Sequence, residues 1–373
     1  MRKKYKIAYI SHFSNLQMGG QRSTYFLIEN INRELYEPIL ICPEKGEFSE
    51  KCSELGIKSY FINLLSIKPK HYFELFKEYH QIRKLIENLD VDIVHVDRDA
   101  DVFITNLAKR GTKAKTIWHI RINGANFFDR FNAKYSDGII GVSEAAKNRV
   151  KVKYLDKYKT IYNGVDLNVF KPPTDKLELR HKLGMPEDKF ILIFVGQLNA
   201  AKGIFDIIEA LNIIKSRGYK LPLTLLIGTA KNNDILKSLH SRLNNYSLEK
   251  DCIIFPQQNN IHKWMQLADA LIIPSYPGIE GLPRVMFEAM ACGCVVIGSN
   301  TPGIKEIIED NYGLLVNAGE PDSIAETINL LMKDEDLQIK LKLKGRIKAE
   351  ELFDIKKHTI EVEKFYQEIL GIL

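Results

Sequence analysis

The sequence predicts an α/β protein built from two doubly wound parallel sheets, each resembling a Rossmann domain. Apolar runs of strand length alternate with amphipathic helical stretches along most of the chain, which is typical of strands joined by crossover helices. This alternation lapses once, where turn-forming residues gather, and then begins again. The length of 373 residues is also that of about two or three domains.

The first alternation predicts an N-terminal domain over residues 1–170. Its expected elements in chain order are KIAYIS, STYFLIENIN, EPILICP, FSEKCSELG, HYFELFKEYHQIRKLIENL, VDIVHVD, VFITNLAKR, AKTIWHI and DGIIGVS. The periodicity then lapses in NGVDLNVFKPPTDK, which contains the turn-forming pairs Asn163-Gly164 and Pro172-Pro173. We therefore expect the domain boundary in this stretch.

The second alternation predicts a C-terminal domain over residues 171–352. Its expected elements are KFILIFVG, GIFDIIEALNIIKSRG, LPLTLLIG, DILKSLHSRLNN, DCIIFP, IHKWMQLA, DALIIPS, a helix within EGLPRVMFEAMACG, and CVVIGSN. The last stretch, from Pro321 onward, is expected to form two helices. The final segment, residues 353–373, is expected to be a helix that returns to the first domain.

Composition and charge limit the classes of protein to which this chain can belong. No apolar run approaches the ~20 residues that a membrane-spanning helix needs, and the basic start has no signal-peptide pattern, so a cytoplasmic protein is expected. The five cysteines are expected to be buried, reduced thiols. Residues 1–172 carry 29 Lys and Arg against 20 Asp and Glu, which makes the first half a candidate for anionic partners or simply a solvated lysine-rich surface.

The stretch IEGLPRVMFEAMACG, residues 279–293, places two glutamates around the start of an expected helix. It follows the expected strand DALIIPS, and ligands of open parallel sheets bind at this end of the strands. A helix that starts near Leu282 would offer free N–H groups to a phosphate or diphosphate. Glu280 would then lie in the loop beside a sugar, and Glu288, about two turns into the helix, would reach a ribose. Solvated or capping glutamates are the alternative interpretation.

Five segments together resemble glycosyltransferase family 4 (group 1). EGLPRVMFEAMACG resembles the E-x7-E motif of that family, IYNGVDLNVFKP its strand-to-hinge segment, and FVGQLNAAKG its G-R-L…KG loop. The early MGGQ resembles its glycine loop, and TIWHI its strand that ends in histidine. They occur in the order of the family and span nearly the whole chain. The resemblance implies the GT-B fold, in which two Rossmann-like domains face a central cleft.

The resemblance also implies roles for individual residues. Glu280, His119 and Lys202 would act at the transferred sugar and the diphosphate: Glu280 on sugar hydroxyls, His119 beside the sugar, and Lys202 as the cation that neutralises the diphosphate. The remaining implied donor-binding residues are Gly19, Gly20, Gly196, Gln197, Gly281, Leu282 and Glu288. The glycines would let the backbone approach the diphosphate.

By the same resemblance, the reaction is expected to be retaining transfer from a UDP- or GDP-sugar, without metal or other cofactor. A metal-independent hexosyl- or other glycosyltransferase is implied, with a glycan or lipid-linked acceptor, for polysaccharide, capsule or lipopolysaccharide synthesis. No aspartate pair stands in a loop suited to holding a metal on the diphosphate. An anionic membrane surface is an expected partner of SIKPKHYFELFKEYHQIRK and KNRVKVKYLDKYK, as a peripheral contact, and nucleic acid is not expected.

Two positions depart from the family pattern. Gln197 stands where the G-R-L segment of the family has arginine, so one positive charge expected at the diphosphate is missing. In TPGIKEII, Glu306 matches only the acidic position of the later proline-glutamate turn of the family. The sequence therefore leaves open how tightly this chain binds its donor.

Rival classes fit the residues less well. A P-loop phosphotransferase is excluded because Ala201 and Gly203 replace the second glycine and the magnesium-binding hydroxyl of its motif. Neither half opens with the G-x-G-x-x-G pattern of dinucleotide oxidoreductases. A sugar epimerase or phosphorylase of the same fold, and a non-catalytic scaffold that binds nucleotide sugars, stay open as alternatives.

Overall fold

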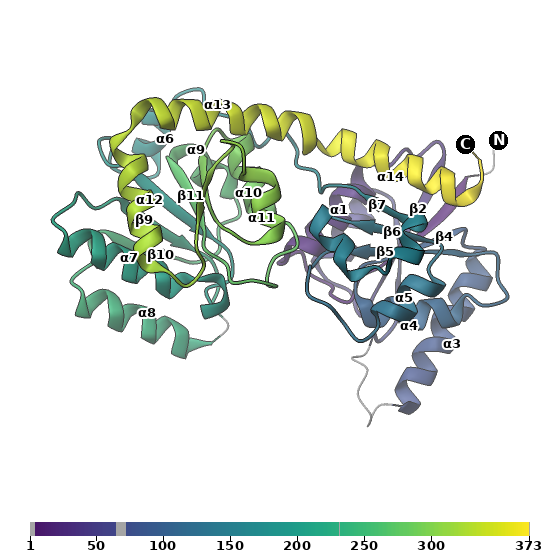
Figure 1. Ribbon diagram of the computed structural model, residues 1–373. Coiled ribbons are helices and arrows are strands. Elements are labelled where there is room, and N and C mark those ends of the chain that lie inside the picture. The colour runs from purple at the N-terminus through teal and green to yellow at the C-terminus, as the bar shows by residue number, and fades with distance from the viewer. Residues whose placement is uncertain (1–3, 65–71, 231, 373) are drawn as a thin grey trace. The chain divides into compact units, whose positions relative to one another are not determined.

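Two parallel sheets, one of seven strands and one of six, divide the chain into two units. The structure is a computed structural model that describes residues 4–64, 72–230 and 232–372. Unit 1 comprises Met1–Gly164 together with Ile355–Leu373, and unit 2 comprises Val165–Asp354 (Figure 1). The boundaries expected from the sequence, 170/171 and 352/353, lie a few residues from these two crossings.

Unit 1 is a seven-stranded parallel sheet in the order β3-β2-β1-β4-β5-β6-β7. Its strands are β1 (Tyr5–Ile10), β2 (Tyr36–Cys42), β3 (Lys58–Phe61), β4 (Ile93–Val96), β5 (Lys115–Ile120), β6 (Gly138–Gly141) and β7 (Tyr158–Thr160). Its helices are α1 (Gly19–Asn30), α2 (Glu47–Glu54), α3 (Tyr72–Leu89), α4 (Asp99–Ala108), α5 (Asp129–Tyr135), η2 (Glu144–Arg149), η3 (Val152–Lys157) and α14 (Ile355–Leu370).

Alternate residues of these strands pack against different helices, as period-two side-chain geometry requires. Ile7 and Tyr9 of β1 belong to a core formed with α1, α2 and α14. Ala8 and Ile10 of the same strand belong to a core formed with α3, α4 and α5. The sheet is thus covered on both faces, which is the doubly wound arrangement that the sequence predicts.

Unit 2 is a six-stranded parallel sheet in the order β10-β9-β8-β11-β12-β13. Its strands are β8 (Ile191–Val195), β9 (Leu223–Ile227), β10 (Cys252–Phe255), β11 (Ala270–Ile273), β12 (Val295–Ser299) and β13 (Leu314–Val316). Its helices are α6 (Lys176–Lys182), η4 (Ala200–Lys202), α7 (Ile204–Ser216), α8 (Asn233–Asn245), α9 (Ile261–Leu267), α10 (Arg284–Ala291), α11 (Pro302–Ile308), α12 (Pro321–Lys333) and α13 (Glu335–Leu352).

The end of the chain forms three helices, so the expectation of two helices from Pro321 onward is wrong. Helix α12 ends at Lys333, and the side chain of Asp334 accepts a hydrogen bond from the Leu337 amide, which caps a new helix, α13. A second break, at Phe353 and Asp354, separates α13 from α14. Helix α14 packs on α1 within unit 1.

The strand order places a reversal in the middle of each sheet. In unit 1 the reversal lies between β1 and β4, and in unit 2 it lies between β8 and β11. Loops that leave the carboxyl ends of the strands diverge at such a switch point, and open α/β sheets bind ligands there. The loops after β8 and β11 in unit 2, and after β1, β4 and β5 in unit 1, are therefore the places to look for a site.

All five cysteines are buried and free, which confirms the expectation of reduced thiols. Burial raises the pKa of each thiol, in Cys252 to about 12. Among the helices that the structure describes, none is both long and apolar enough to cross a bilayer.

Candidate functional site

In unit 2 the loops after β8 and β11 are joined at their backbones. The Tyr276 amide donates to the Ala201 carbonyl oxygen at 3.0 Å. Gly203 lies directly against Pro274: its φ is +73°, and a Cβ atom there would come 2.3 Å from the Pro274 carbonyl oxygen. Only glycine fits this combination of positive φ and close approach. The contact sets Lys202, the residue before Gly203, beside the second loop.

Lys202 and Glu280 form an ion pair across these two loops. Their side chains are 21% and 16% exposed, so the pair is partly shielded from water. Ser275 donates from its hydroxyl to Glu280 at 3.4 Å, and Asn199 accepts from the Lys202 amide at 3.1 Å. The structure thus brings together two residues expected at the diphosphate and the sugar. Ser275 and Asn199 were not foreseen from the sequence.

The loop after β8 also contains Gly196 and Gln197. Gly196 has φ of +157°, and its carbonyl oxygen lies so close to Gly228 that a Cβ atom on Gly228 would come within 1.7 Å of it. This packing leaves room for backbone alone. The Gln197 side chain is exposed, at the edge of the same loop.

Helix α10 follows the loop that contains Glu280. Pro283 is its N-cap and Arg284 its first residue, one or two positions after the start expected near Leu282. Leu282 and Gly281 are buried at its mouth. Glu288 lies one turn further, only 4% exposed, and its carboxylate accepts from Arg284 at 3.0 Å. This helix partner of Glu288 could have been found from the i,i+4 spacing.

In unit 1 the helix α1 begins at Gly19, and Gly20 packs against the side chain of Arg121. A Cβ atom on Gly20 would come 3.3 Å from Arg121 Cδ, tighter than ordinary contact. Arg121 donates to Asp97 at 2.9 Å, to Asn163 at 3.0 Å and to Thr24 at 2.9 Å. The guanidinium therefore ties together the carboxyl ends of β4 and β5 with α1. Sequence analysis missed Arg121, although an arginine directly after a buried strand is a readable signal.

His119, expected beside the donor sugar, is fully buried near the end of β5. Its Nδ1 atom lies 2.8 Å from His95 Nε2, while its Nε2 atom has no hydrogen-bond partner in the described part of the chain. Burial and the neighbouring Arg121 hold the pKa of His119 well below its usual range, so its imidazole is neutral. A neutral histidine with one unpaired nitrogen can serve a ligand as donor or acceptor.

The aspartates after β4 are all engaged by arginines. Asp97 pairs with Arg121, and the buried Asp101 accepts from Arg98 at 2.9 Å. Asp99 lies between Arg149, at 2.9 Å, and the indole N–H of Trp118, at 3.0 Å. Within residues 4–64, 72–230 and 232–372, no group of three or more His, Cys, Asp or Glu side chains is placed to hold a metal ion.

In the described residues, the two basic segments expected at a membrane do not form a continuous cationic surface. Residues 65–71, which include all of SIKPKH, lie outside the described residues. In the second segment Arg149 is buried in its ion pairs with Asp99 and Asp129, and Lys157 donates to the Ser136 carbonyl. Lys147, Lys151 and Lys153 face solvent, with Val152 84% exposed between them.

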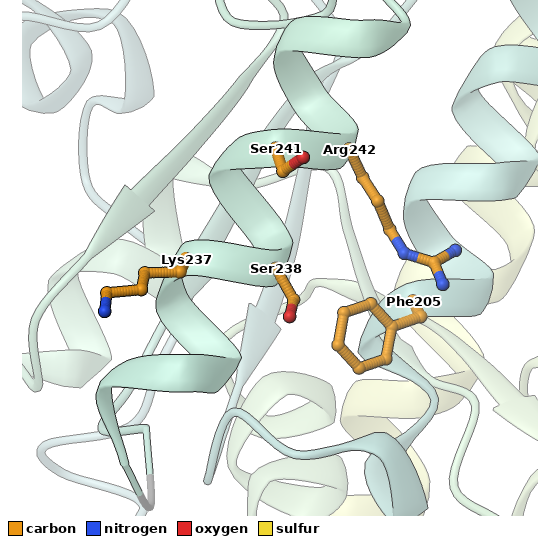
Figure 2. Close-up of a pocket in the computed structure, with 5 residues that line it drawn as sticks. All are labelled: Phe205, Lys237, Ser238, Ser241 and Arg242. Carbon is orange, nitrogen blue, oxygen red and sulfur yellow. The ribbon is translucent and has the colours of Figure 1, made fainter.

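A shallow depression lies elsewhere on unit 2, between α7 and α8 (Figure 2). Lys237, Ser238, Ser241 and Arg242 line it from α8, and Phe205 lines it from α7. The Arg242 guanidinium lies over the Phe205 ring, 4.8 Å from its centre. None of the residues expected to bind a donor lines this depression.

Comparison with known proteins agrees with the family resemblance that the sequence motifs show. The profile of the family described as "Glycosyl transferases group 1" matches residues 175–348, and that of "Glycosyltransferase Family 4" matches residues 18–169. An Escherichia coli UDP-Gal:alpha-D-GlcNAc-diphosphoundecaprenol alpha-1,3-galactosyltransferase is 25% identical over 97% of both chains. The Staphylococcus aureus capsular polysaccharide biosynthesis glycosyltransferase CapM is 26% identical over 70% of this chain and 69% of its own.

Among solved structures, HepE from Anabaena in complex with UDP and glucose has a TM-score of 0.81 and 19% identity, covering 98% of this chain and all of its own. Two doubly wound parallel-sheet units with these neighbours define the GT-B class of fold. The chain belongs to the group 1 glycosyltransferases of family 4, and it is a glycosyltransferase. The S. aureus relative is named for capsular polysaccharide biosynthesis.

Proposed function

We propose that this glycosyltransferase moves a sugar from a nucleoside-diphosphate donor to a glycan or lipid-linked acceptor, with retention at the anomeric carbon and without a metal ion. The observation that carries the proposal is the Lys202–Glu280 pair at the switch point of unit 2, beside the mouth of α10. Support for a UDP-sugar comes from HepE, whose structure contains UDP and glucose. Support for a lipid-linked acceptor comes from the name of the E. coli relative.

The proposed chemistry needs no protein nucleophile. The bond between the anomeric carbon and the phosphate oxygen breaks, so that negative charge grows on the leaving diphosphate. The acceptor hydroxyl forms the new bond on the same face, and its proton goes to the leaving phosphate oxygen. Lys202 and the N–H groups at the start of α10 stabilise the growing charge more in the transition state than in the ground state.

Each remaining residue has a binding role in this proposal. Glu280, released from Lys202 by the incoming diphosphate, accepts hydrogen bonds from sugar hydroxyls. Glu288, held in place by Arg284, accepts from the ribose hydroxyls. Gly19 and Gly20 admit the diphosphate close to the backbone at the start of α1, and His119 contacts the sugar through its unpaired Nε2 atom. Gly281, Leu282, Gly196 and Gln197 line the diphosphate path.

A panel of UDP- and GDP-sugars tested for protection against thermal unfolding addresses the donor. A ligand at ~100 times its dissociation constant adds about 2.7 kcal/mol to the free energy of unfolding. Product NMR with the protective donor then gives the anomeric outcome. Inversion, or activity that EDTA abolishes, would refute retention or metal independence respectively. Conversion of the donor without an acceptor would favour an epimerase.

We further propose that the protein acts at the cytoplasmic face of a membrane, through the exposed Lys147, Lys151 and Lys153. Each lysine near an anionic surface contributes about 1 kcal/mol, and the exposed Val152 can enter the interface between them. Sedimentation with vesicles containing anionic lipid should exceed that with neutral vesicles at low salt. The double substitution Lys151→Glu and Lys153→Glu should remove the difference; equal binding to both kinds of vesicle would end this proposal.

A further inference from the structure

A continuous hydrogen-bonded chain of four side chains runs through the core of unit 1. The Tyr366 hydroxyl donates to the Tyr9 hydroxyl oxygen at 3.2 Å and lies 2.7 Å from His95 Nδ1. His95 Nε2 in turn lies 2.8 Å from His119 Nδ1. Tyr366 comes from the C-terminal helix α14, which places it 271 residues from His95 in sequence. The last helix of the chain is thereby connected to the end of β5.

The chain is shielded from water. Tyr9, His119 and Tyr366 have no exposed surface, and His95 is 2% exposed. Burial lowers the pKa of His95 and of His119 well below the usual value, and the nearby Arg121 and His358 lower it further. Both imidazoles are therefore neutral near pH 7, and each carries one N–H.

The Tyr366 hydroxyl determines which nitrogen of His95 and of His119 carries the proton. The single Tyr366 proton is donated to Tyr9, so the 2.7 Å contact with His95 requires a proton on His95 Nδ1. Neutral His95 then has a bare Nε2, and the 2.8 Å contact with His119 requires a proton on His119 Nδ1. Neutral His119 is left with a bare Nε2, which accepts hydrogen bonds and cannot donate them.

That bare nitrogen is the atom that finds no partner in the described part of the protein. A buried polar atom without a partner costs free energy, and such atoms in native proteins need an explanation. His119 is the penultimate residue of β5, and Arg121, directly after the strand, packs on Gly20 at the start of α1. The unpaired acceptor therefore belongs to the carboxyl edge of the sheet, where a ligand of this fold binds.

We propose that Tyr366 and His95 are positioning residues that hold His119 in the Nδ1–H tautomer, so that its Nε2 accepts a hydrogen bond from a hydroxyl of the donor sugar. This inference rests on the proposed function for the identity of the ligand. The site then favours a sugar that carries a hydroxyl at this position over the corresponding deoxy sugar, because the deoxy sugar leaves a buried acceptor unpaired. The C-terminal helix takes part in donor recognition through this chain.

The first test is spectroscopic and needs no substrate. The full-length protein labelled with ¹⁵N-histidine should show, for His119, a protonated Nδ1 and a bare Nε2 at neutral pH. Tyr366→Phe removes the acceptor of the His95 Nδ1 proton, so the opposite tautomer, with a proton on His119 Nε2, should become populated. A proton on His119 Nε2 in the unsubstituted protein would overturn the proposal, and so would an unchanged tautomer in Tyr366→Phe.

Tyr36→Phe is the matched control. The Tyr36 ring packs edge-on against Tyr366, 5.9 Å between centres, and its hydroxyl donates to the Glu363 carbonyl oxygen of α14 at 3.3 Å. This substitution removes an equal hydroxyl from the same aromatic cluster and leaves the four-membered chain intact. The His119 tautomer should be unchanged in Tyr36→Phe.

The second test is kinetic. Tyr366→Phe should lower kcat/KM for the preferred sugar donor about tenfold, the effect of one hydrogen bond, while the affinity for UDP alone stays unchanged because UDP lacks the transferred sugar. Tyr36→Phe should change neither quantity. Equal losses of UDP affinity and kcat/KM in both variants would show a merely structural role and overturn the proposal. If no donor supports turnover, the proposed function fails, and the histidine spectrum still decides the tautomer.

Discussion

The ammonium group of Lys202 lies in an ion pair with the carboxylate of Glu280, although the two residues are 78 positions apart. Each belongs to a loop that leaves a strand at the switch point of the sheet in unit 2. Without a donor, each charge neutralises the other at a partly buried position, where an unpaired charge would be costly. The pair keeps both groups in place for a ligand that separates them.

Lys202→Ala should lower kcat/KM by at least ~100-fold, or about 2.7 kcal/mol, because the charge that develops on the diphosphate loses its main side-chain partner. Lys202→Arg should recover only part of the lost kcat/KM, since the planar guanidinium group does not replace the compact ammonium group. Lys305→Ala, which breaks an exposed pair with Glu309 in the same unit, is the control and should leave the rate unchanged. Near-normal rates in folded Lys202→Ala would mean that the diphosphate binds elsewhere.

Gln197→Arg should tighten the binding of a nucleoside diphosphate. The exposed Gln197 lies in the loop that leads to Lys202, so an arginine there adds a cation beside the same anion. Calorimetry with UDP and GDP measures the gain, which should shrink as salt is added because the side chain is exposed. Unchanged affinity at low salt would place the diphosphate out of reach of position 197. Slower product release is an expected cost of the tighter binding.

Gly203→Ala should destabilise the protein and also impair activity. The new Cβ atom meets the Pro274 carbonyl at 2.3 Å and adopts a positive φ, so the loop that holds Lys202 must move. Gly218→Ala is the control: φ there is +69°, but nothing lies within 4 Å, so only the conformational cost of about 1 kcal/mol applies. Urea unfolding and kcat/KM measure both effects. Equal losses of stability in the two variants would contradict the clash.

Asp269→Asn should lower the free energy of unfolding by about 3 kcal/mol at pH 7, because the buried Arg180 and the partly buried Lys176 lose their shared counter-charge. Its carboxylate accepts from Lys176 at 2.6 Å, from Arg180 at 2.7 Å and from the Ile191 amide at 2.8 Å. Although burial alone would raise the pKa of Asp269, these contacts lower it below the ordinary value.

The sign of the pH dependence follows from that lowered pKa. The carboxylate stabilises the folded state fully above its unfolded pKa of about 3.9, and this contribution is lost as the pH falls through the lower folded value. The difference between the native protein and Asp269→Asn in urea unfolding should therefore shrink below about pH 4. Asp322→Asn, which alters an exposed pair with Arg217, should change stability by no more than about 0.5 kcal/mol. A pH-independent difference would contradict the ionic origin.

Sequence patterns predicted the two parallel sheets well, because alternation of apolar strands and amphipathic helices depends on local burial. Lys202 and Glu280 could be predicted as site residues because each lies in a motif a few residues long. Their ion pair could not be predicted, because it depends on the contact of Gly203 with Pro274.

The partners of His119 were beyond sequence analysis for a similar reason. Tyr366 occupies a buried position of an amphipathic helix, where any large apolar side chain would satisfy the pattern. Its contact with His95 exists only because α14 packs on the first sheet. The break between α12 and α13 was missed, although Asp334 and the acidic residues after it are a readable start signal for a helix.

The return of α14 to unit 1 has a consequence for the order of events at the ribosome. Val362, Phe365 and Tyr366 complete the core that Ile7, Tyr9 and Ile93 begin. Those strands leave the exit tunnel first, yet the helix that covers them is translated after the whole of unit 2. An apolar strip of the nascent first sheet therefore stays uncovered while about 190 further residues are translated, which takes about ten to forty seconds at about 5–20 residues per second. The final folding step of unit 1 therefore has to follow the emergence of α14 from the ribosome, not that of the first sheet.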